Sequence, residues 1–429
     1  MAKYFGTDGI RGKSPEWLDA LKAYKIGYAI GHGLSAQKVY VGRDTRKTGL
    51  MLNQALNQGL LDTAVNPINL GVVSTPMVQY LSHIEQCFGV MITASHNPAS
   101  DNGIKIIKSG QKSSEEDEII IESYIDQVDF KFDSFSEIQD NQEDLKQYFR
   151  GLRSLGFNPS SREVFLDTAH GSLSQWGKKI LGEFTNITGT IGNQPDGVNI
   201  NQGVGSTSLN TLINHKPEGI IGLAFDGDGD RLIAIDEHGN HVTGDQILSI
   251  INQQLNIDTK MVFTKMLNPG IKLALNNLGI ETLETDIGDK YVIQALMDNQ
   301  ILIGGEDSGH MMFKDIWPIG DGLISALLLI KALEKGKMKL VEAAKQFQKY
   351  PEMLLNIKNI HKEDYRSNEK LQRELSILNK SLDKYAKVLI RPSGTEPVIR
   401  VYLSHKNENK LNDLTVSYIT LFNKHGGTL

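Results

Sequence analysis

The sequence predicts an α/β protein. Short apolar runs at residues 39–41, 164–166, 220–225 and 301–303 each end in a polar loop, which for the last run begins at Gly304, and helix-like segments tend to follow them. This alternation is typical of α/β units, in which functional loops lie at the carboxyl ends of the strands. Hydrophobic residues make up 40% of the chain, which is enough to build several cores of ordinary size.

Length and polarity predict several domains. The chain has 429 residues, and at about 150 residues per domain this suggests roughly three or four. Three polar stretches, at residues 126–143, 236–245 and 359–368, interrupt the ordered pattern. We therefore expect four units, of which the last is the smallest: residues 1–140, 141–243, 244–358 and 359–429.

Charge and apolar content exclude several classes of function. The net charge is −6 and no long basic run is present, so we expect no nucleic-acid partner. The first residues carry no apolar signal segment, and the longest apolar stretch, residues 323–330, is far too short to span a bilayer. With a single cysteine, Cys87, no intrachain disulfide can form. We expect a cytoplasmic protein with no membrane partner.

The strongest motif is an acidic loop in which Asp226, Asp228 and Asp230 alternate with glycines. Carboxylates two residues apart can converge on one hard cation, and oxygen ligands suit Mg²⁺ or Ca²⁺ rather than zinc. An EF-hand loop is the competing interpretation. It fails because Arg231 stands where the turn needs glycine, and because residues 232–236 are typical of a strand. The alternative without function is a solvated acidic turn. It is disfavoured because three carboxylates this close repel one another.

A second motif places Ser95 directly after the apolar run 90–92 and three residues before Pro98. A serine at a strand exit is well placed as a nucleophile, although an ordinary turn before proline would explain this motif alone. The Gly-x-Ser-x-Gly elbow of serine hydrolases is absent, which weakens a hydrolase interpretation. Nearby Lys105 and the acidic loop favour a catalytic Ser95.

A third motif, residues 391–397, offers the parts of a phosphate cradle. It contains hydroxyl groups, backbone N–H groups around a glycine, and two guanidinium groups in or just after the loop. A proline and glycine turn between strands at residues 387–390 and 398–403 is an equally good interpretation of the motif alone. The candidate ligands are Arg391, Ser393, Gly394, Thr395 and Arg400.

A fourth motif, residues 304–310, carries Glu306, Ser308 and His310. The first two side chains could bind sugar hydroxyls. The histidine could move a proton, since its reference pKa lies near neutrality. A glycine-rich turn with an incidental histidine is the simpler interpretation of this loop in isolation.

The amino terminus supplies a fifth motif, residues 5–12, where Arg11 could neutralise a transferring phosphoryl group; a turn-rich terminus is the plain alternative. Together the five loops resemble the α-D-phosphohexomutase superfamily over essentially the whole chain. Within it, the opening residues 3–12 and the stretch 195–201 resemble the bacterial members that act on glucosamine phosphate, and residues 288–292 and 320–322 support the same placement.

The resemblance implies an architecture and a set of site residues. Four domains would surround a central cleft, three of a similar mixed α/β fold and a smaller α+β domain at the carboxyl end. Ser95 would be a phosphoserine whose phosphate, with Asp226, Asp228 and Asp230, holds one Mg²⁺. Catalytic roles near the transferring group would fall to Arg11, His96, Lys105 and His310. The substrate would be bound by Arg231, Glu306, Ser308, Arg391, Ser393, Gly394, Thr395 and Arg400.

The resemblance also implies a reaction. Glucosamine 6-phosphate and glucosamine 1-phosphate would interconvert through a 1,6-bisphosphate, ahead of UDP-N-acetylglucosamine and cell-wall synthesis. A kinase, or glucosamine or glucose 1,6-bisphosphate as activator, would prime the serine, and the chain would be a monomer or a homodimer. A phosphoglucomutase or phosphomannomutase, a non-catalytic sugar-phosphate binding protein and a serine hydrolase are the alternatives.

Some positions depart from the pattern of the family. Asp307 stands where Gln or Asn is usual, next to the sugar-binding motif, and Lys290 replaces an expected Arg. His170 and Ile319 depart in the same way. These differences bear on the sugar that is preferred rather than on the phosphoryl-transfer residues, which are all present.

Overall fold

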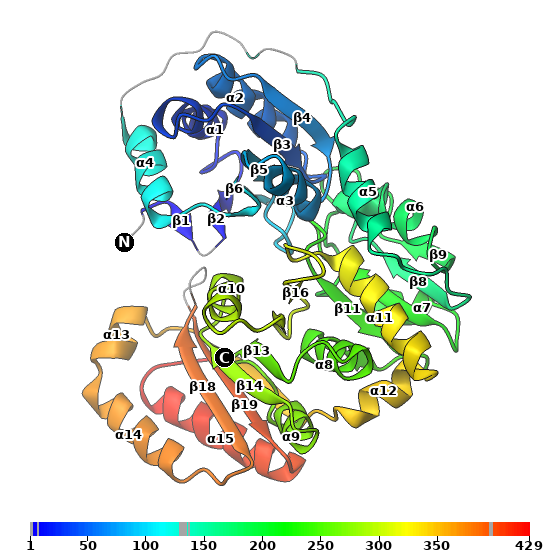
Figure 1. Cartoon of the computed structure of the whole chain (residues 1–429). Helices are drawn as coiled ribbons and strands as arrows, with labels where there is room; N and C mark the ends of the chain where they lie inside the picture. The colour runs from blue at the N-terminus through cyan, green and yellow to red at the C-terminus, as the bar shows by residue number, and fades with distance from the viewer. Residues whose placement is uncertain (1–2, 7, 128–134, 136–137, 394–397) are drawn as a thin grey trace.

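The computed structural model describes all residues except 1–2, 7, 128–134, 136–137 and 394–397. Over these described residues the chain forms four β-sheets, which follow one another along the sequence with helices packed against each (Figure 1). In Figure 1 the first sheet lies at the top, the second at the right, the third near the centre and the last at the bottom. The predicted α/β class is therefore confirmed.

The first sheet has the strand order β1-β2-β6-β5-β3-β4, with β7 beside β6. Alternate residues of β3 face two different cores, since Val39 and Val41 pack on one side and Tyr40 on the other. The strands are β1 Phe5–Gly6, β2 Gly9–Lys13, β3 Val39–Arg43, β4 Pro67–Val72, β5 Phe88–Ile92, β6 Asp101–Lys108 and β7 Gln111–Lys112. The helices are α1 Ala20–Tyr28, a π-helical turn Ala29–Gly33, α2 Gly49–Leu61, α3 Thr75–Ile84 and α4 Glu115–Asp126.

The second sheet, of order β12-β11-β10-β8-β9, carries the acidic loop between β10 and β11. Its central strand β10 is buried at every position, as expected of a strand covered on both faces. The strands are β8 Glu163–Asp167, β9 Asn186–Ile191, β10 Ile221–Phe225, β11 Leu232–Ile235 and β12 His241–Val242. The helices are α5 Leu145–Ser154, a 3₁₀ turn Ser172–Ser174, α6 Gly177–Leu181 and α7 Asn210–His215.

The third sheet, of order β14-β13-β15-β16, carries the loop of the fourth sequence motif. Its strands are β13 Lys260–Thr264, β14 Glu281–Thr285, β15 Ile303–Gly305 and β16 Met311–Phe313. Its helices are α8 Gly244–Leu255, α9 Pro269–Asn277, α10 Asp289–Asp298, α11 Gly322–Gly336 and α12 Leu340–Gln346. The apolar stretch at residues 323–330 lies in α11, which is capped by Asp321 and buried around most of its surface.

One continuous apolar core joins these first three regions. It runs from Tyr40 of the first sheet, through Phe225 of the second and Phe263 of the third, to Phe347 after α12. A second core fills the other face of the first sheet, under α1, α2 and α4. Most of the chain before residue 350 is thus fixed by shared packing.

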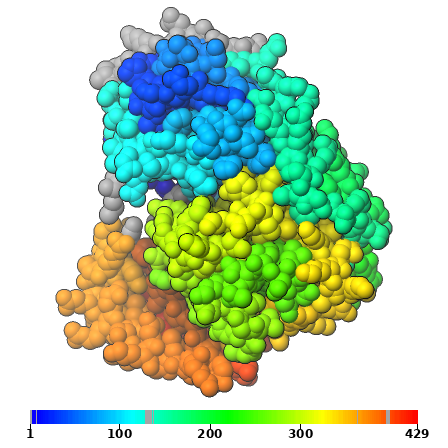
Figure 2. Space-filling model, in the orientation of Figure 1, coloured from blue at the N-terminus to red at the C-terminus, as the bar shows by residue number. Residues whose placement is uncertain are grey.

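The carboxyl-terminal region has a core of its own. Its sheet has the order β17-β19-β18, and its core runs from Leu355 to Phe422 without joining the larger one. The strands are β17 Glu352–Ile357, β18 Ala386–Pro392 and β19 Ile399–His405, and the helices are α13 Lys362–Ser367, α14 Glu369–Lys380 and α15 Glu408–Lys424. Figure 2 shows the molecule hollowed between this region, in orange, and the amino-terminal elements, in blue and cyan.

Two strand boundaries differ from the sequence prediction. The apolar run 301–303 was expected to end before Gly304, but β15 spans Ile303–Gly305. A Cβ at Gly305 would lie 2.5 Å from the backbone oxygen of His310, so this glycine permits close pairing with β16 rather than a turn. Similarly β18 extends to Pro392, which places Arg391 inside a strand. Over the described residues, helices long and apolar enough to cross a membrane are absent.

Candidate active site

Ser95 lies in the loop that follows β5, and its backbone is in the left-handed region at φ 51°. Such a conformation is uncommon for a residue other than glycine and is found preferentially at functional sites. The side chain is buried, and its Oγ donates a hydrogen bond to Oδ2 of Asp226 at 2.6 Å. The Nδ1 atom of His96 lies 3.3 Å from the same Oγ. The sequence-distant serine and acidic loop therefore meet.

Two side chains hold the serine loop in place. Arg46 is fully buried and pairs with Asp44 at 2.9 Å. The amide of Asn201 donates to the backbone oxygen of Ser95 at 2.8 Å. The guanidinium of Arg46 donates to the backbone oxygens of Ser95, Asn97, Pro98 and Asp101. With this many charge-assisted bonds the loop has little freedom to change shape.

The acidic loop turns sharply between β10 and β11. A Cβ at Gly227 would lie 2.5 Å from the backbone oxygen of Ser95, so only glycine lets the two loops approach. One carboxylate oxygen each from Asp226, Asp228 and Asp230 lies within 4.8 Å of the others, and all three residues are buried. The spacing predicted from the sequence thus produces one convergent group of carboxylates.

The pKa values of two of the three carboxylates are shifted in opposite directions. Burial, together with the charges of Asp230 and Asp228, raises the pKa of Asp226 well above its usual range. Burial also raises the pKa of Asp230, but Lys105 and its other cationic neighbours outweigh this and lower it to about 2. Burial lowers the pKa of Lys105, whereas Asp228, Asp8 and Asp230 raise it far more, so this lysine keeps its proton.

The donor set of this cluster fits a divalent metal ion. Oδ1 of Asp228 and Oδ1 of Asp230 are buried and have no hydrogen-bond partner among the residues that the structure describes. A buried carboxylate oxygen without a donor is unfavourable, and a hard cation would satisfy both atoms.

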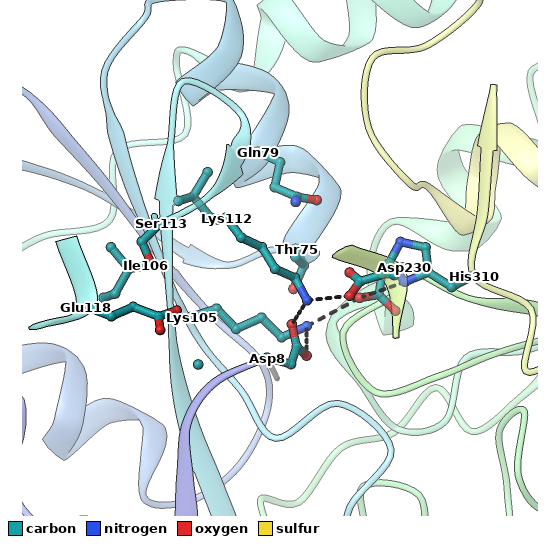
Figure 3. A pocket seen from close by; sticks show the side chains of 13 residues that line it. Asp8, Thr75, Gln79, Lys105, Ile106, Lys112, Ser113, Glu118, Asp230 and His310 are labelled. Atoms are coloured by element: carbon teal, nitrogen blue, oxygen red, sulfur yellow. Dashed lines mark hydrogen bonds and ion pairs between the residues drawn. The ribbon is translucent and has the colours of Figure 1, made fainter. Parts of the chain in front are cut away.

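Cationic side chains contact these carboxylates, and Figure 3 shows Lys105 extending towards Asp230 and Asp8. Lys105 Nζ lies 2.8 Å from Oδ2 of Asp228, 3.3 Å from Oδ2 of Asp230 and 3.0 Å from Oδ2 of Asp8. Arg11 contacts the same Oδ2 of Asp8 at 2.6 Å. Asp8 therefore holds two of the predicted catalytic cations side by side.

Arg231, His96 and His310 complete this cluster. Burial, Arg231 and Arg11 lower the pKa of His96 to about 4, so its imidazole is neutral near pH 7. Burial opposes the charge on Arg231, but the carboxylates of Asp226 and Asp230 raise its pKa above the usual range. The Nδ1 atom of His310 lies 4.0 Å from Oδ2 of Asp230, and its backbone pairs with that of Arg231.

Glu306 and Ser308 follow β15 and are both half-buried. Oε1 of Glu306 accepts a hydrogen bond from the backbone N–H of Gly288 at 3.2 Å. The charge of Glu306 also raises the pKa of Arg231, so the loop at residues 304–310 lies near the acidic loop.

Arg391 and Arg400 lie directly opposite each other on the antiparallel strands β18 and β19. Like charges in such a pair repel, and burial together with Arg400 lowers the pKa of Arg391. The carboxylates of Glu306 and Asp307 raise the pKa of Arg391, so the predicted phosphate cradle lies near the predicted sugar-binding residues. Ser393 is buried and lies between the two arginines in the sequence. The predicted ligands Gly394 and Thr395 lie outside the described residues.

Comparison with known proteins places this site in a family. Phosphoglucomutase/phosphomannomutase family models match residues 2–132 as α/β/α domain I, 243–350 as α/β/α domain III, and 330–418 as the C-terminal domain. The phosphoglucosamine mutase of Bacillus licheniformis is 40% identical, covering 98% of this chain and 97% of that protein. That of Staphylococcus carnosus is 40% identical over 96% of each chain. The chain belongs to the phosphoglucosamine mutase family.

Solved structures of the wider phosphohexomutase superfamily share the fold. A phosphoglucomutase/phosphomannomutase family protein from Burkholderia thailandensis superposes with a TM-score of 0.78 at 21% identity, over 97% of both chains. The N-acetylphosphoglucosamine mutase of Aspergillus fumigatus, solved with GlcNAc-6P and magnesium, gives 0.68 at 16% identity, over 98% of this chain and 96% of that one.

The structure shows further residues at the site that the sequence patterns did not single out. Asp44 and Arg46 follow β3 just as Ser95 follows β5, so the same strand-exit signal was available for them. Thr75, at the start of α3, donates to Oδ2 of Asp228 at 2.5 Å. Asn201 lies far from any strand end, and its contact with Ser95 follows only from the folded chain.

Proposed function

We propose that this chain interconverts glucosamine 6-phosphate and glucosamine 1-phosphate, with Ser95 carrying a phosphoryl group between turnovers. The main support is the hydrogen bond of 2.6 Å from Ser95 Oγ to Asp226, inside a buried group of three carboxylates. The relatives at 40% identity carry the name phosphoglucosamine mutase. A buried serine beside unsatisfied carboxylate oxygens suits a site that binds a metal ion and a phosphoryl group together.

The acidic loop would hold Mg²⁺. Asp226, Asp228 and Asp230 would each give an oxygen ligand, and an oxygen of the Ser95 phosphate would give a fourth. Oxygen ligands alone, with room for water, suit Mg²⁺. When bound, the ion would offset negative charge on the phosphoryl oxygens.

In the first transfer, the 1-hydroxyl of glucosamine 6-phosphate attacks the phosphorus on Ser95. The new O–P bond forms as the Ser95 Oγ–P bond breaks, and the hydroxyl proton replaces the phosphoryl group on Ser95. We assign His310 to accept that proton from the sugar and to release it again, so that the net result is one proton moved from the sugar hydroxyl to Ser95 Oγ. Arg11, Lys105 and neutral His96 would stabilise the charge that spreads over the phosphoryl oxygens.

In the second transfer, the bisphosphate has turned round and Ser95 Oγ attacks the phosphorus of the 6-phosphate. The Oγ–P bond forms as the O6–P bond breaks, and the serine proton is replaced by one on the sugar 6-hydroxyl. The other phosphate must then be held where the 6-phosphate was held before. Arg391, Ser393 and Arg400 would form this cradle with Gly394 and Thr395, because two opposed guanidiniums can bind one dianion bidentately. Glu306, Ser308 and Arg231 would bind the sugar and its phosphate between the two sites.

We also propose that the chain is divided into four units, at residues 1–140, 141–243, 244–358 and 359–429. The separate core of the carboxyl-terminal region supports movement of the last unit over the cleft. Such closure would exclude water, which otherwise would hydrolyse the phosphoserine.

The test is mutase activity on glucosamine 6-phosphate with Mg²⁺ and a trace of glucose 1,6-bisphosphate as priming activator. We expect turnover that a chelator abolishes, and a fraction of the intact protein that carries one phosphate. Ser95→Ala should lose both the activity and the phosphate. Ser100→Ala, in an exposed part of the same loop, is the matched control and should keep both.

The alternatives predict different results. Turnover of glucose or mannose phosphates that equals or exceeds that of the glucosamine ester would favour a phosphoglucomutase or phosphomannomutase. Activity that persists in chelator would favour a hydrolase. A phosphate-free protein without turnover would leave only a sugar-phosphate binding protein.

A further inference from the structure

Lys112, at the end of the hairpin formed by β6 and β7, contacts two acidic residues from distant parts of the chain. Its Nζ lies 2.8 Å from Oδ1 of Asp8 and 2.6 Å from Oδ1 of Asp289. The side chain is 26% exposed, so most of this double ion pair is shielded from water. Solvent and salt screen shielded pairs less than surface pairs, and removal of one partner leaves the other charges buried and unpaired, which is costly.

On one side, Lys112 reaches the phosphoryl-transfer residues. Asp8 uses its Oδ1 for Lys112 and its Oδ2 for Arg11 and Lys105. Burial would raise the pKa of Asp8, but Lys105, Lys112 and Arg11 hold it well below its usual range. The carboxylate is therefore ionised and fixed at both oxygens, and its two catalytic partners are fixed with it.

On the other side, Lys112 reaches the sugar-binding motif. Asp289 is the first residue of α10, and the preceding Gly288 donates its N–H to Oε1 of Glu306 at 3.2 Å. A shift of the α10 amino terminus would therefore carry Glu306 with it. Figure 3 shows Lys112 and Lys105 extending side by side towards Asp8, from the strands of the first sheet.

We propose that Lys112 is a positioning residue of the mutase reaction, which sets the distance between the phosphoryl-transfer residues and the sugar-binding motif. It does so by pairing at once with Asp8 and Asp289, and it contacts neither the phosphoryl group nor the sugar. A substrate that presents its two ends in turn needs this distance to be the same in both transfers. The inference rests on the proposed roles of Arg11, Lys105 and Glu306.

The first test is Lys112→Met, assayed with glucosamine 6-phosphate, Mg²⁺ and the activating bisphosphate. Because misplacement of reacting groups by about 1 Å can lower rates by roughly 100-fold, we expect kcat/KM to fall by about 10- to 100-fold. Lys108→Met is the matched control: Lys108 lies on the same hairpin but pairs with Asp117 at 2.9 Å. It should stay within about two-fold of the unaltered enzyme.

Variants of the two partners separate a positioning role from a structural one. Asp289→Asn should raise KM several-fold with little loss of kcat, because it releases the sugar-binding side. Asp8→Asn should lower kcat with little change in KM. The double variant Asp8→Asn with Lys112→Met should have nearly the same kcat as Asp8→Asn alone, because both changes break the same contact. Lys112→Arg keeps the charge and should recover part of the lost kcat/KM.

The proposal is overturned if Lys112→Met stays within two-fold of Lys108→Met, or if the Asp8 and Lys112 changes lower kcat independently. If Lys112→Met does not fold, as judged by its thermal unfolding, Asp289→Asn decides alone, and an unchanged KM overturns the proposal. An unaltered protein with no mutase activity would instead refute the proposed function. That outcome is therefore distinct from a failure of this inference.

Discussion

Ser95 and the three aspartates lie in the buried interior between the first two sheets, whereas Glu306, Ser308 and Arg391 lie on half-exposed segments further along the chain. We call the first group, with Lys105, the transfer half, and the second, with Ser393 and Arg400, the ligand half. In the transfer half each described charge is paired or points at a common centre. In the ligand half two arginines face each other.

The difference matches what each half would do in the proposed reaction. Charge stabilisation of a transferring phosphoryl group requires fixed dipoles and charges in a site that water does not fill. Recognition of a substrate in two orientations requires groups that accept the same phosphate at either end. The larger core fixes the transfer half, while the carboxyl-terminal region with Arg391 and Arg400 packs around a separate core.

Removal of the arginine that holds the serine loop should have the largest effect. Arg46→Met leaves Asp44 and four backbone oxygens without their buried donor. We expect a loss of about 3–5 kcal/mol in the free energy of unfolding. Urea denaturation measures it, with half-exposed Arg43→Met as the control that should lose less than about 1 kcal/mol. Equal losses in the two variants would contradict a rigid transfer half.

Loss of one metal-facing carboxylate should come next. Asp228→Asn keeps the shape of the side chain but removes the charge that faces the metal site and Lys105. We expect turnover to fall by roughly 100- to 1000-fold, with KM little changed. Steady-state rates over a Mg²⁺ titration check this. Exposed Asp298→Asn is the control. A near-normal rate in Asp228→Asn would refute the metal assignment.

Removal of an arginine from the ligand half should change KM more than kcat. Arg391→Ala removes one of the two opposed guanidiniums. A hydrogen bond to a charged group contributes about 1.5–3 kcal/mol, so KM should rise roughly 10- to 100-fold with a smaller change in kcat. Exposed Arg366→Ala serves as the control. If kcat falls while KM stays constant, the two halves are not functionally separate.

The smallest expected effect concerns Asp307, which lies within the motif at residues 304–310 and is affected by the charge of buried Asp245. Burial, followed by the charges of Asp245 and Glu306, raises the pKa of Asp307 to about 7. Since the folded-state pKa lies above the unfolded value of about 3.9, the folded protein binds the extra proton. The stability from this proton is present at low pH and is lost as pH rises from about 4 to about 7.

Asp307→Asn should therefore raise the unfolding temperature at pH 8 and change it little near pH 4. Partial exposure of Asp307 limits the gain to the order of 1 kcal/mol. Thermal unfolding at the two pH values measures it, with exposed Asp315→Asn as the control that should behave alike at both. A gain of equal size at both pH values would show that the carboxyl does not titrate in this range.

The meeting of Ser95 with the acidic loop was expected from the family resemblance, whereas local sequence patterns predicted the class of fold and selected Ser95 and the three aspartates as candidates. These patterns succeed because strand exits and alternating carboxylates are encoded by adjacent residues. The predicted ends of the strands near Gly305 and Pro392 were wrong, because the end of a strand depends on the neighbouring strand with which its backbone pairs. A glycine pattern is the same in a turn and in a strand that pairs closely with its neighbour.

Residues that act through long-range contacts could not be selected in this way. Asn201 contacts the Ser95 loop, and Lys112 pairs with Asp8 and Asp289, across more than a hundred residues of chain. No spacing rule connects such positions. The predicted roles of Gly394 and Thr395 fall outside the described residues and stay predictions.

The isolated apolar core of the carboxyl-terminal region has an evolutionary consequence. Substitutions within Leu355–Phe422 can accumulate without disturbing the packing that supports Ser95 and the aspartates. Lineages could therefore exchange or reshape this region to accept a different phosphorylated sugar while inheriting the phosphoryl-transfer chemistry intact. A chimaera that carries the equivalent region of a relative would reproduce that history in a single step.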